Sequence, residues 1–185
     1  AAWGRAAQGA ALQKHGPFVP LELPGGTLPT DPGPVPPRPT PSPLGPRVPP
    51  DDRPALEAAF RSALGGDDMI LTDPTGAHIL TGIAIVDHIW DDESRRNAGR
   101  ERFFPLIRPL VEQPEEIWIG FATDQATGRV SMRRRYVAYW QLDKERTLGL
   151  VADADGRMWS GLTFFMGNSR GLAGLRTGRR IFKPT

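Results

Sequence analysis

Four apolar runs separated by short polar segments restrict the fold of this chain more than any other feature. The runs are of strand length, are rich in β-branched and aromatic residues, and cover residues 116–122, 135–142, 147–152 and 158–165. The last polar segment contains Asp155-Gly156, a pair favoured in hairpin turns because it tolerates positive φ. Three consecutive hairpins predict a four-stranded antiparallel meander.

Two segments ahead of the first strand have apolar residues at helical spacing. Residues 56–64 follow Pro54, which suits a first helical turn, and end at Gly65-Gly66. Residues 100–112 carry a second apolar stripe that includes Phe103 and Phe104, but Pro105 and Pro109 each remove an amide hydrogen bond. We expect this second helix to be kinked or restarted, and its apolar stripe to cover one face of the meander.

Between these segments, residues 69–72 and 78–81 flank an Asp-Pro-Thr-Gly turn and predict a short accessory hairpin. Residues 83–92 then predict another helix, because their apolar side chains fall on one stripe at 3.6 residues per turn. The elements together indicate an α+β domain, with helices packed on a four-stranded antiparallel meander.

The N-terminal third of the chain has a different composition. Residues 16–50 are dominated by Pro and Gly, which predicts an extended linker. We therefore divide the chain into residues 1–15, the tail of a preceding domain, the linker 16–50 and the domain 51–185. Because so Pro-rich a segment has little to bury, we expect that everything before Asp51 can be deleted without loss of the fold.

The charge of the chain is unevenly distributed. The net charge is only +2, but the pI is about 9.4, and basic residues crowd two regions. They are Arg129, Arg133, Arg134, Arg135, Lys144 and Arg146 around the first two turns, and Arg170, Arg176, Arg179, Arg180 and Lys183 near the C-terminus. Such clustering favours a polyanionic partner, although any single arginine could simply solubilise an edge strand or a turn.

Several function classes lack their sequence signatures. The chain has no cysteine, and hence no disulfide or thiolate metal site. It has no Walker-type loop and no Gly-x-Ser-x-Gly elbow, and the scattered His15, His78 and His88 do not form a zinc set. No stretch approaches the ~20 apolar residues of a membrane span. We expect no cofactor, no metal site and no membrane partner.

His88 is the histidine best placed for chemistry. On the predicted helix it projects away from the apolar stripe, with Ala84, Asp91 and Arg95 as its neighbours on that face. An imidazole beside a guanidinium is suited to proton transfer near neutral pH. The alternative is an ordinary solvated surface histidine.

Short motifs along residues 69–182 resemble a known family. They include the helix with Asp87-His88, the string Arg100-x-x-Phe-Phe-Pro-Leu-Ile and the segment Pro114-Glu-Glu-Ile-Trp118, followed by Tyr136-Val-Ala-Tyr139 and Leu162-Thr-Phe-Phe165. This series is similar to the predicted nuclease domain at the C-terminus of phage Mu F-type head morphogenesis proteins, which is grouped with barnase, EndoU, colicin-type tRNA nucleases and RelE toxins. The N-terminal segment and linker are similar to the junction between such a head protein and its cargo.

The resemblance implies a metal-independent endoribonuclease whose catalytic residues are His88, Arg100 and Thr163. RNA is the expected substrate, a phage head protein the expected N-terminal fusion partner, and a cognate immunity protein a further partner. The expected location is the virion, followed by delivery into the cytoplasm of the bacterial host. From side-chain chemistry we add a set of RNA-binding residues: Arg95, Arg133, Arg135, Tyr136 and Arg176. Arg133 to Arg135 do not match the family pattern.

Two alternatives stay open at this point. One is a non-catalytic virion protein that binds packaged nucleic acid or a neighbouring head subunit through its basic sheet. The other is an ADP-ribosyltransferase toxin, which is disfavoured because the chain lacks a convincing Arg, Ser-Thr-Ser and Glu-x-Glu series.

Overall fold

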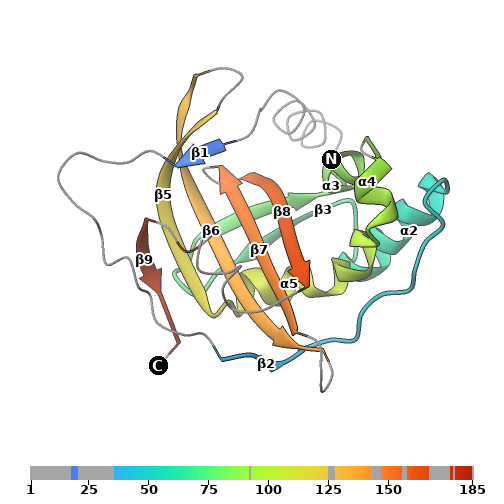
Figure 1. Ribbon diagram of the computed structural model, residues 1–185, viewed down its shortest axis with the longest axis horizontal. Helices are drawn as coiled ribbons and strands as arrows, with labels where there is room; N and C mark the ends of the chain where they lie inside the picture. Colours follow the sequence, from blue (N-terminus) through green and yellow to red (C-terminus); the bar gives the residue numbers. More distant parts are fainter. Residues whose placement is uncertain are drawn as a thin grey trace.

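The computed structural model places helices against one face of a curled sheet (Figure 1). It describes residues 18–20, 36–91, 93–124, 128–142, 147–155, 158–166, 176 and 178–184. Side chains are described for residues 36–91, 93–123, 128–142, 176 and 178–184.

The predicted meander is present. Its strands pair antiparallel in chain order, and they are β5 (Glu116–Asp124), β6 (Val130–Gln141), β7 (Thr147–Asp155) and β8 (Met158–Met166). The register runs directly across all four strands, so that Glu116, Val137, Val151 and Thr163 stand in one cross-strand row.

The sheet as a whole is mixed, so the expectation of a purely antiparallel meander is wrong. The predicted hairpin of β3 (Asp68–Thr72) and β4 (His78–Gly82) joins the sheet where Leu80 of β4 pairs in parallel with Met158 of β8. Other short strands extend it: β2 (Arg38–Pro39) runs parallel to β6, and β1 (Phe18–Pro20) and β9 (Arg179–Phe182) pair antiparallel with β5. These pairings join strands far apart in the sequence, so no local turn signal announces them.

The first described helix, α2 (Arg53–Leu64), has the end signals that the sequence predicts. The Asp52 side chain accepts a hydrogen bond from the backbone N–H of Ala55 at 2.9 Å, which satisfies a donor that the helix itself leaves unpaired. Gly65 ends the helix in the left-handed conformation, at φ 88°.

The later helices follow the prediction of a restart at proline. The described elements are α3 (Ala84–Trp90), α4 (Glu93–Asn97), the 3-10 helix η1 (Arg100–Phe103) and α5 (Phe104–Glu112). Pro105 lies in the first turn of α5, where its missing N–H has no helical partner to lose. The break between η1 and α5 falls between Phe103 and Phe104, one residue ahead of this proline.

One hydrophobic core joins the helices to the sheet. Phe60 of α2 meets Phe104 of α5 edge to face, with ring centroids 5.4 Å apart. The strands contribute alternate residues, and the buried members from β5 and β6 are Ile117, Tyr136, Ala138 and Trp140. Figure 1 shows α5 behind the sheet, where it contacts β6 and β7.

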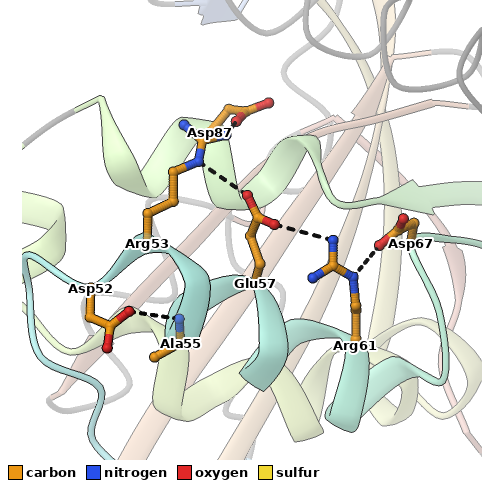
Figure 2. A network of polar contacts seen from close by, with 7 residues as sticks. All are labelled: Asp52, Arg53, Ala55, Glu57, Arg61, Asp67 and Asp87. Carbon is orange, nitrogen blue, oxygen red and sulfur yellow. Dashed lines mark hydrogen bonds and ion pairs between the residues drawn. The ribbon is translucent and has the colours of Figure 1, made fainter.

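A chain of ion pairs fixes α2 against its neighbours (Figure 2). Glu57 accepts from Arg53 and from Arg61, each at 3.1 Å, and Arg61 also pairs with Asp67 at 2.6 Å. Arg53 reaches Asp87 on α3 as well. Each pair is partly exposed and contributes little stability by itself, but together they link α2 to α3 and to the start of β3.

The Pro-rich segment packs on the domain well before Asp51. The backbone N–H of Gly45 donates to Arg102 O at 2.8 Å, and Arg47 pairs with the buried Glu101 at 3.0 Å. Val48 donates its backbone N–H to the same carboxylate at 3.2 Å, and its side chain belongs to the core. Residues 45–48 are thus part of the packed structure, and a chain that begins at Asp51 would lose these contacts.

Candidate nucleic-acid interface

The face of the sheet opposite the core carries most of the predicted RNA-binding arginines. Side chains alternate between the two faces of a strand, so Glu116 and Trp118 of β5 lie away from the core residue Ile117. On β6, the same face receives Arg133 and Arg135, because Arg135 stands opposite Trp118 in the register. We call Glu116, Trp118, Arg133 and Arg135 the polar sheet face.

Glu116 is the centre of a buried cluster on this face. Its carboxylate receives two hydrogen bonds from Arg176, at 2.6 Å from Nε and 2.7 Å from Nη2. Arg180 adds a third at 3.0 Å, and Trp118 Nε1 a fourth at 2.8 Å. The two guanidinium groups also lie over the Trp118 ring, at 6.0 Å for Arg176 and 5.7 Å for Arg180. The carboxylate is therefore satisfied by charged and neutral donors on all sides.

The pKa of Glu116 is lowered by this environment. Burial alone acts in the opposite direction and raises it, but the hydrogen bonds from Arg176 and Trp118 and the positive charge of Arg176 outweigh burial. Glu116 is consequently ionised at neutral pH, and it balances the charge of one of its two arginines.

The two arginines of the polar sheet face itself, Arg133 and Arg135, are less accessible than Arg180. Arg133 is only 6% exposed, and Arg135 is half-buried. In the backbone register they stand opposite Asp155 and Asp153 of β7, whose side chains lie outside the described residues. The predicted residues Arg133, Arg135 and Arg176 therefore share one face of the sheet.

Tyr136 does not belong to this face. It is fully buried in the core, and its hydroxyl donates to Asp73 Oδ2 at 2.8 Å. Burial, followed by the hydrogen bond to Asp73, raises the pKa of Tyr136. Arg134 pairs with the same carboxylate at 3.1 Å, so Asp73 ties the β3–β4 turn to β6. Tyr136 has a structural position, and its ring is not open to a stacking base.

His88 and Arg95 are neighbours, as their spacing predicts. Arg95 Nη1 lies 2.9 Å from the backbone oxygen of His88 and 3.2 Å from its ring Nδ1. Because a guanidinium has no acceptor atom, Nδ1 must accept, and the neutral ring then carries its proton on Nε2. Arg95 thus fixes both the ring orientation and the tautomer of His88.

Arg100 and Thr163 occupy separate elements. Arg100 opens η1 and is half-buried. Thr163 lies on β8, in the cross-strand row that begins at Glu116, and its side chain lies outside the described residues. His88, Arg100 and Thr163 therefore come from three different elements, and their joint catalytic role stays a prediction.

The sequence interpretation missed Glu116, Trp118 and Arg180. Glu116 and Trp118 are two residues apart in one strand, a spacing that places them on one face. Their arginine partners lie about sixty residues later in the chain, and no periodicity reports a contact over that separation.

Metal-binding groups and membrane-spanning helices are both absent from the described residues. No group of three or more His, Asp or Glu side chains there could hold a metal ion. No helix in the same residues is long and apolar enough to cross a membrane.

Comparison with known proteins identifies the family of the domain. Residues 55–183 match the family model described as phage-Barnase-EndoU-ColicinE5/D-RelE like nuclease2. No curated protein and no solved structure matches the chain. The matched residues include all of α2 except its first two residues, the whole meander and β9, together with the polar sheet face and its C-terminal arginines. The chain belongs to the phage-Barnase-EndoU-ColicinE5/D-RelE like nuclease family.

Proposed function

We propose that the protein is a metal-independent endoribonuclease that cuts RNA by attack of a ribose 2′-hydroxyl on the adjacent phosphodiester. The observation that carries the proposal is the family match, which covers both the His88 helix and the arginine-rich sheet face. Family membership suggests nuclease activity; the choice of RNA and of a metal-free route is ours.

The chemistry requires three kinds of group. The 2′-oxygen forms a bond to phosphorus while the bond from phosphorus to the 5′-oxygen breaks, a base takes the 2′-hydroxyl proton, and the leaving oxygen is protonated. Positive donors stabilise the extra charge on the five-coordinate phosphorus. We assign the proton acceptor to His88, phosphate binding to Arg100 and Arg95, and a hydrogen bond to a phosphate oxygen to Thr163. The leaving oxygen takes its proton from water.

The contact between Arg95 and His88 adds a condition to this assignment. In the free protein Arg95 donates to Nδ1 of His88, while the neutral ring carries its proton on Nε2. His88 accepts a proton at Nδ1 only when Arg95 leaves that nitrogen. The phosphate that we assign to Arg95 supplies the competing acceptor.

The test is cleavage of single-stranded RNA and of intact tRNA in EDTA, with analysis of the product ends. We expect 2′,3′-cyclic phosphate ends, and an activity loss of ~10²-fold or more in His88→Ala and in Arg100→Ala. His78→Ala is the matched control, because His78 is exposed on β4, where it contacts Thr72. Thermal midpoints measured on the same variants separate loss of chemistry from loss of fold.

Opposite results would overturn the proposal in identifiable ways. Strict dependence on a divalent metal, or 3′-hydroxyl products, would contradict the mechanism. Full activity in His88→Ala would remove the central catalytic assignment. RNA binding without cleavage would favour the alternative of a nucleic-acid-binding virion protein. We place the protein in the virion, with delivery to the bacterial cytoplasm, where its substrate RNA would be found.

A further inference from the structure

Two neighbouring arginines of β9 lie on opposite faces of the sheet. In the register with β5, Arg180 stands opposite Trp118 and Arg179 stands opposite Ile119. Because successive strand residues point to opposite faces, Arg180 joins the polar sheet face and Arg179 faces the other way. Both residues are exposed.

Arg176 and Arg180 both bind Glu116 but differ in exposure. Arg176 makes the two-pronged contact, and its side chain is 3% exposed, whereas the Arg180 side chain is 35% exposed. The guanidinium of Arg180 is therefore the more accessible of the two.

Arg180 is also held in place before any ligand arrives. Its guanidinium lies 5.7 Å from the centroid of the Trp118 ring and donates to Glu116 Oε1 at 3.0 Å. A long arginine side chain normally loses rotamer freedom when it binds a ligand, and this loss opposes binding. Stacking on Trp118 moves much of that loss into folding, which favours binding of a ligand with two acceptor oxygens, such as a phosphate.

We propose that Arg180 is a phosphate ligand for RNA, held in position by Trp118 and Glu116, while Arg176 serves to neutralise Glu116. This inference rests on the proposed function and names the contact by which the sheet meets its substrate. Arg133 and Arg135 are weaker candidates, since Arg133 is buried and both stand opposite β7 aspartates in the register. The RNA backbone accordingly runs past the β5–β9 edge of the polar sheet face.

The test compares Arg180→Ala with Arg179→Ala in the full chain. These variants remove the same charge from adjacent positions of one strand, and only the face differs. Binding is measured by fluorescence anisotropy with a single-stranded 2′-O-methyl RNA oligonucleotide, which has no free 2′-hydroxyl and so separates binding from cleavage. We expect Arg180→Ala to weaken binding ~10-fold and to reduce the salt slope by about 0.7, the value for one phosphate contact on a single strand. Arg179→Ala should change affinity less than ~2-fold.

The outcomes distinguish this inference from the proposed function. Equal losses in the two variants, no loss in Arg180→Ala, or no binding by the wild-type protein would each overturn the inference. Wild-type binding without cleavage of ordinary RNA would overturn the nuclease proposal and leave the phosphate contact standing. Arg180→Lys keeps the charge but loses the planar stack, and an affinity between wild type and Arg180→Ala would support the role of Trp118. A thermal midpoint for each variant confirms that the fold is retained.

Discussion

The guanidinium of Arg176 donates two hydrogen bonds, of 2.6 and 2.7 Å, to the carboxylate of Glu116, although the residues are sixty positions apart in the chain. Both side chains are buried. This contact holds the C-terminal segment against the start of β5, and it brings Arg180 to the same carboxylate. A nearly solvent-free ion pair of this kind is costly to break from one side only.

We predict that Arg176→Ala lowers the free energy of unfolding by ~3 to 5 kcal/mol, because it removes the main partner of a buried charge. The control is Glu112→Gln, which breaks the exposed pair of Arg108 and Glu112 on α5, a 3.0 Å contact. Glu112→Gln should lower the free energy of unfolding by less than ~0.5 kcal/mol. Urea unfolding at pH 7 measures both, and equal costs would show that the Glu116 cluster contributes no special stability.

Glu116 and Glu115 should affect stability in opposite directions as pH changes. The pKa of Glu116 is lowered in the folded state. The stability that the ionised carboxylate contributes is therefore present above pH 4.5, the ordinary pKa of the group, and is lost as the pH falls through the lower folded-state pKa. Burial raises the pKa of Glu115 to about 7, despite its 2.6 Å pair with Arg38 and its hydrogen bond from the Tyr139 amide.

For Glu115, the folded state holds its proton more tightly than the unfolded chain does. Stability must then fall as the pH rises from about 4.5 to about 7, the ordinary and raised pKa values of this carboxyl. We predict that Glu115→Gln removes this decline and makes the protein more stable than wild type at pH 8. Urea unfolding across pH 4 to 8 tests it. The same slope in wild type and Glu115→Gln would assign the pH dependence to another group.

The sequence predicted those elements whose signals are local. α2 is bounded by Asp52 and Gly65, and short polar segments of the sequence separate the four strands of the meander, so the positions of these elements follow from neighbouring residues alone. The contact of Arg95 with His88 is equally local, since the two residues are seven positions apart. The parallel pairing of Leu80 with Met158 has no such signal, because it joins distant segments.

The site is harder to predict, because the second half of β6 is buried on both faces. Tyr136, Val137, Ala138, Tyr139 and Trp140 are all buried, so this stretch shows no alternation of apolar and polar residues that would tell which face each side chain takes. The sequence alone therefore leaves Tyr136 open to an RNA-binding role, although its hydroxyl binds Asp73 in the core. In the sequence Arg180 is only one member of a basic cluster, because the role proposed for it depends on its contacts with Trp118 and Glu116.

We predict that a chain starting at Asp51 is less stable than one starting at Pro36. The shorter chain loses the buried Val48 side chain, the β2 pairing with β6 and the partners of the buried Glu101 carboxylate. Leaving a buried charge without its partner and exposing apolar core surface both lower the free energy of unfolding. Thermal midpoints of the two chains measure this difference. Identical midpoints would support the domain boundary at Asp51 that the composition predicts.

The last prediction concerns Gly178, the residue that leads into β9. Its φ is 93°, and a Cβ atom there would lie 2.3 Å from the backbone oxygen of Ile119, closer than any real contact. Gly76, in the β3–β4 turn, has a similar φ of 84° but has open space around the corresponding position. Alanine at either site adopts a left-handed conformation at a cost of about 1 to 2 kcal/mol, but only Gly178→Ala must also push β9 away from β5. We therefore expect Gly178→Ala to lose more stability in urea unfolding than Gly76→Ala does, and to weaken binding of the 2′-O-methyl RNA because Arg180 moves with the strand. A Gly178→Ala variant that binds this RNA as wild type does would show that the position of β9 is not needed for the phosphate contact.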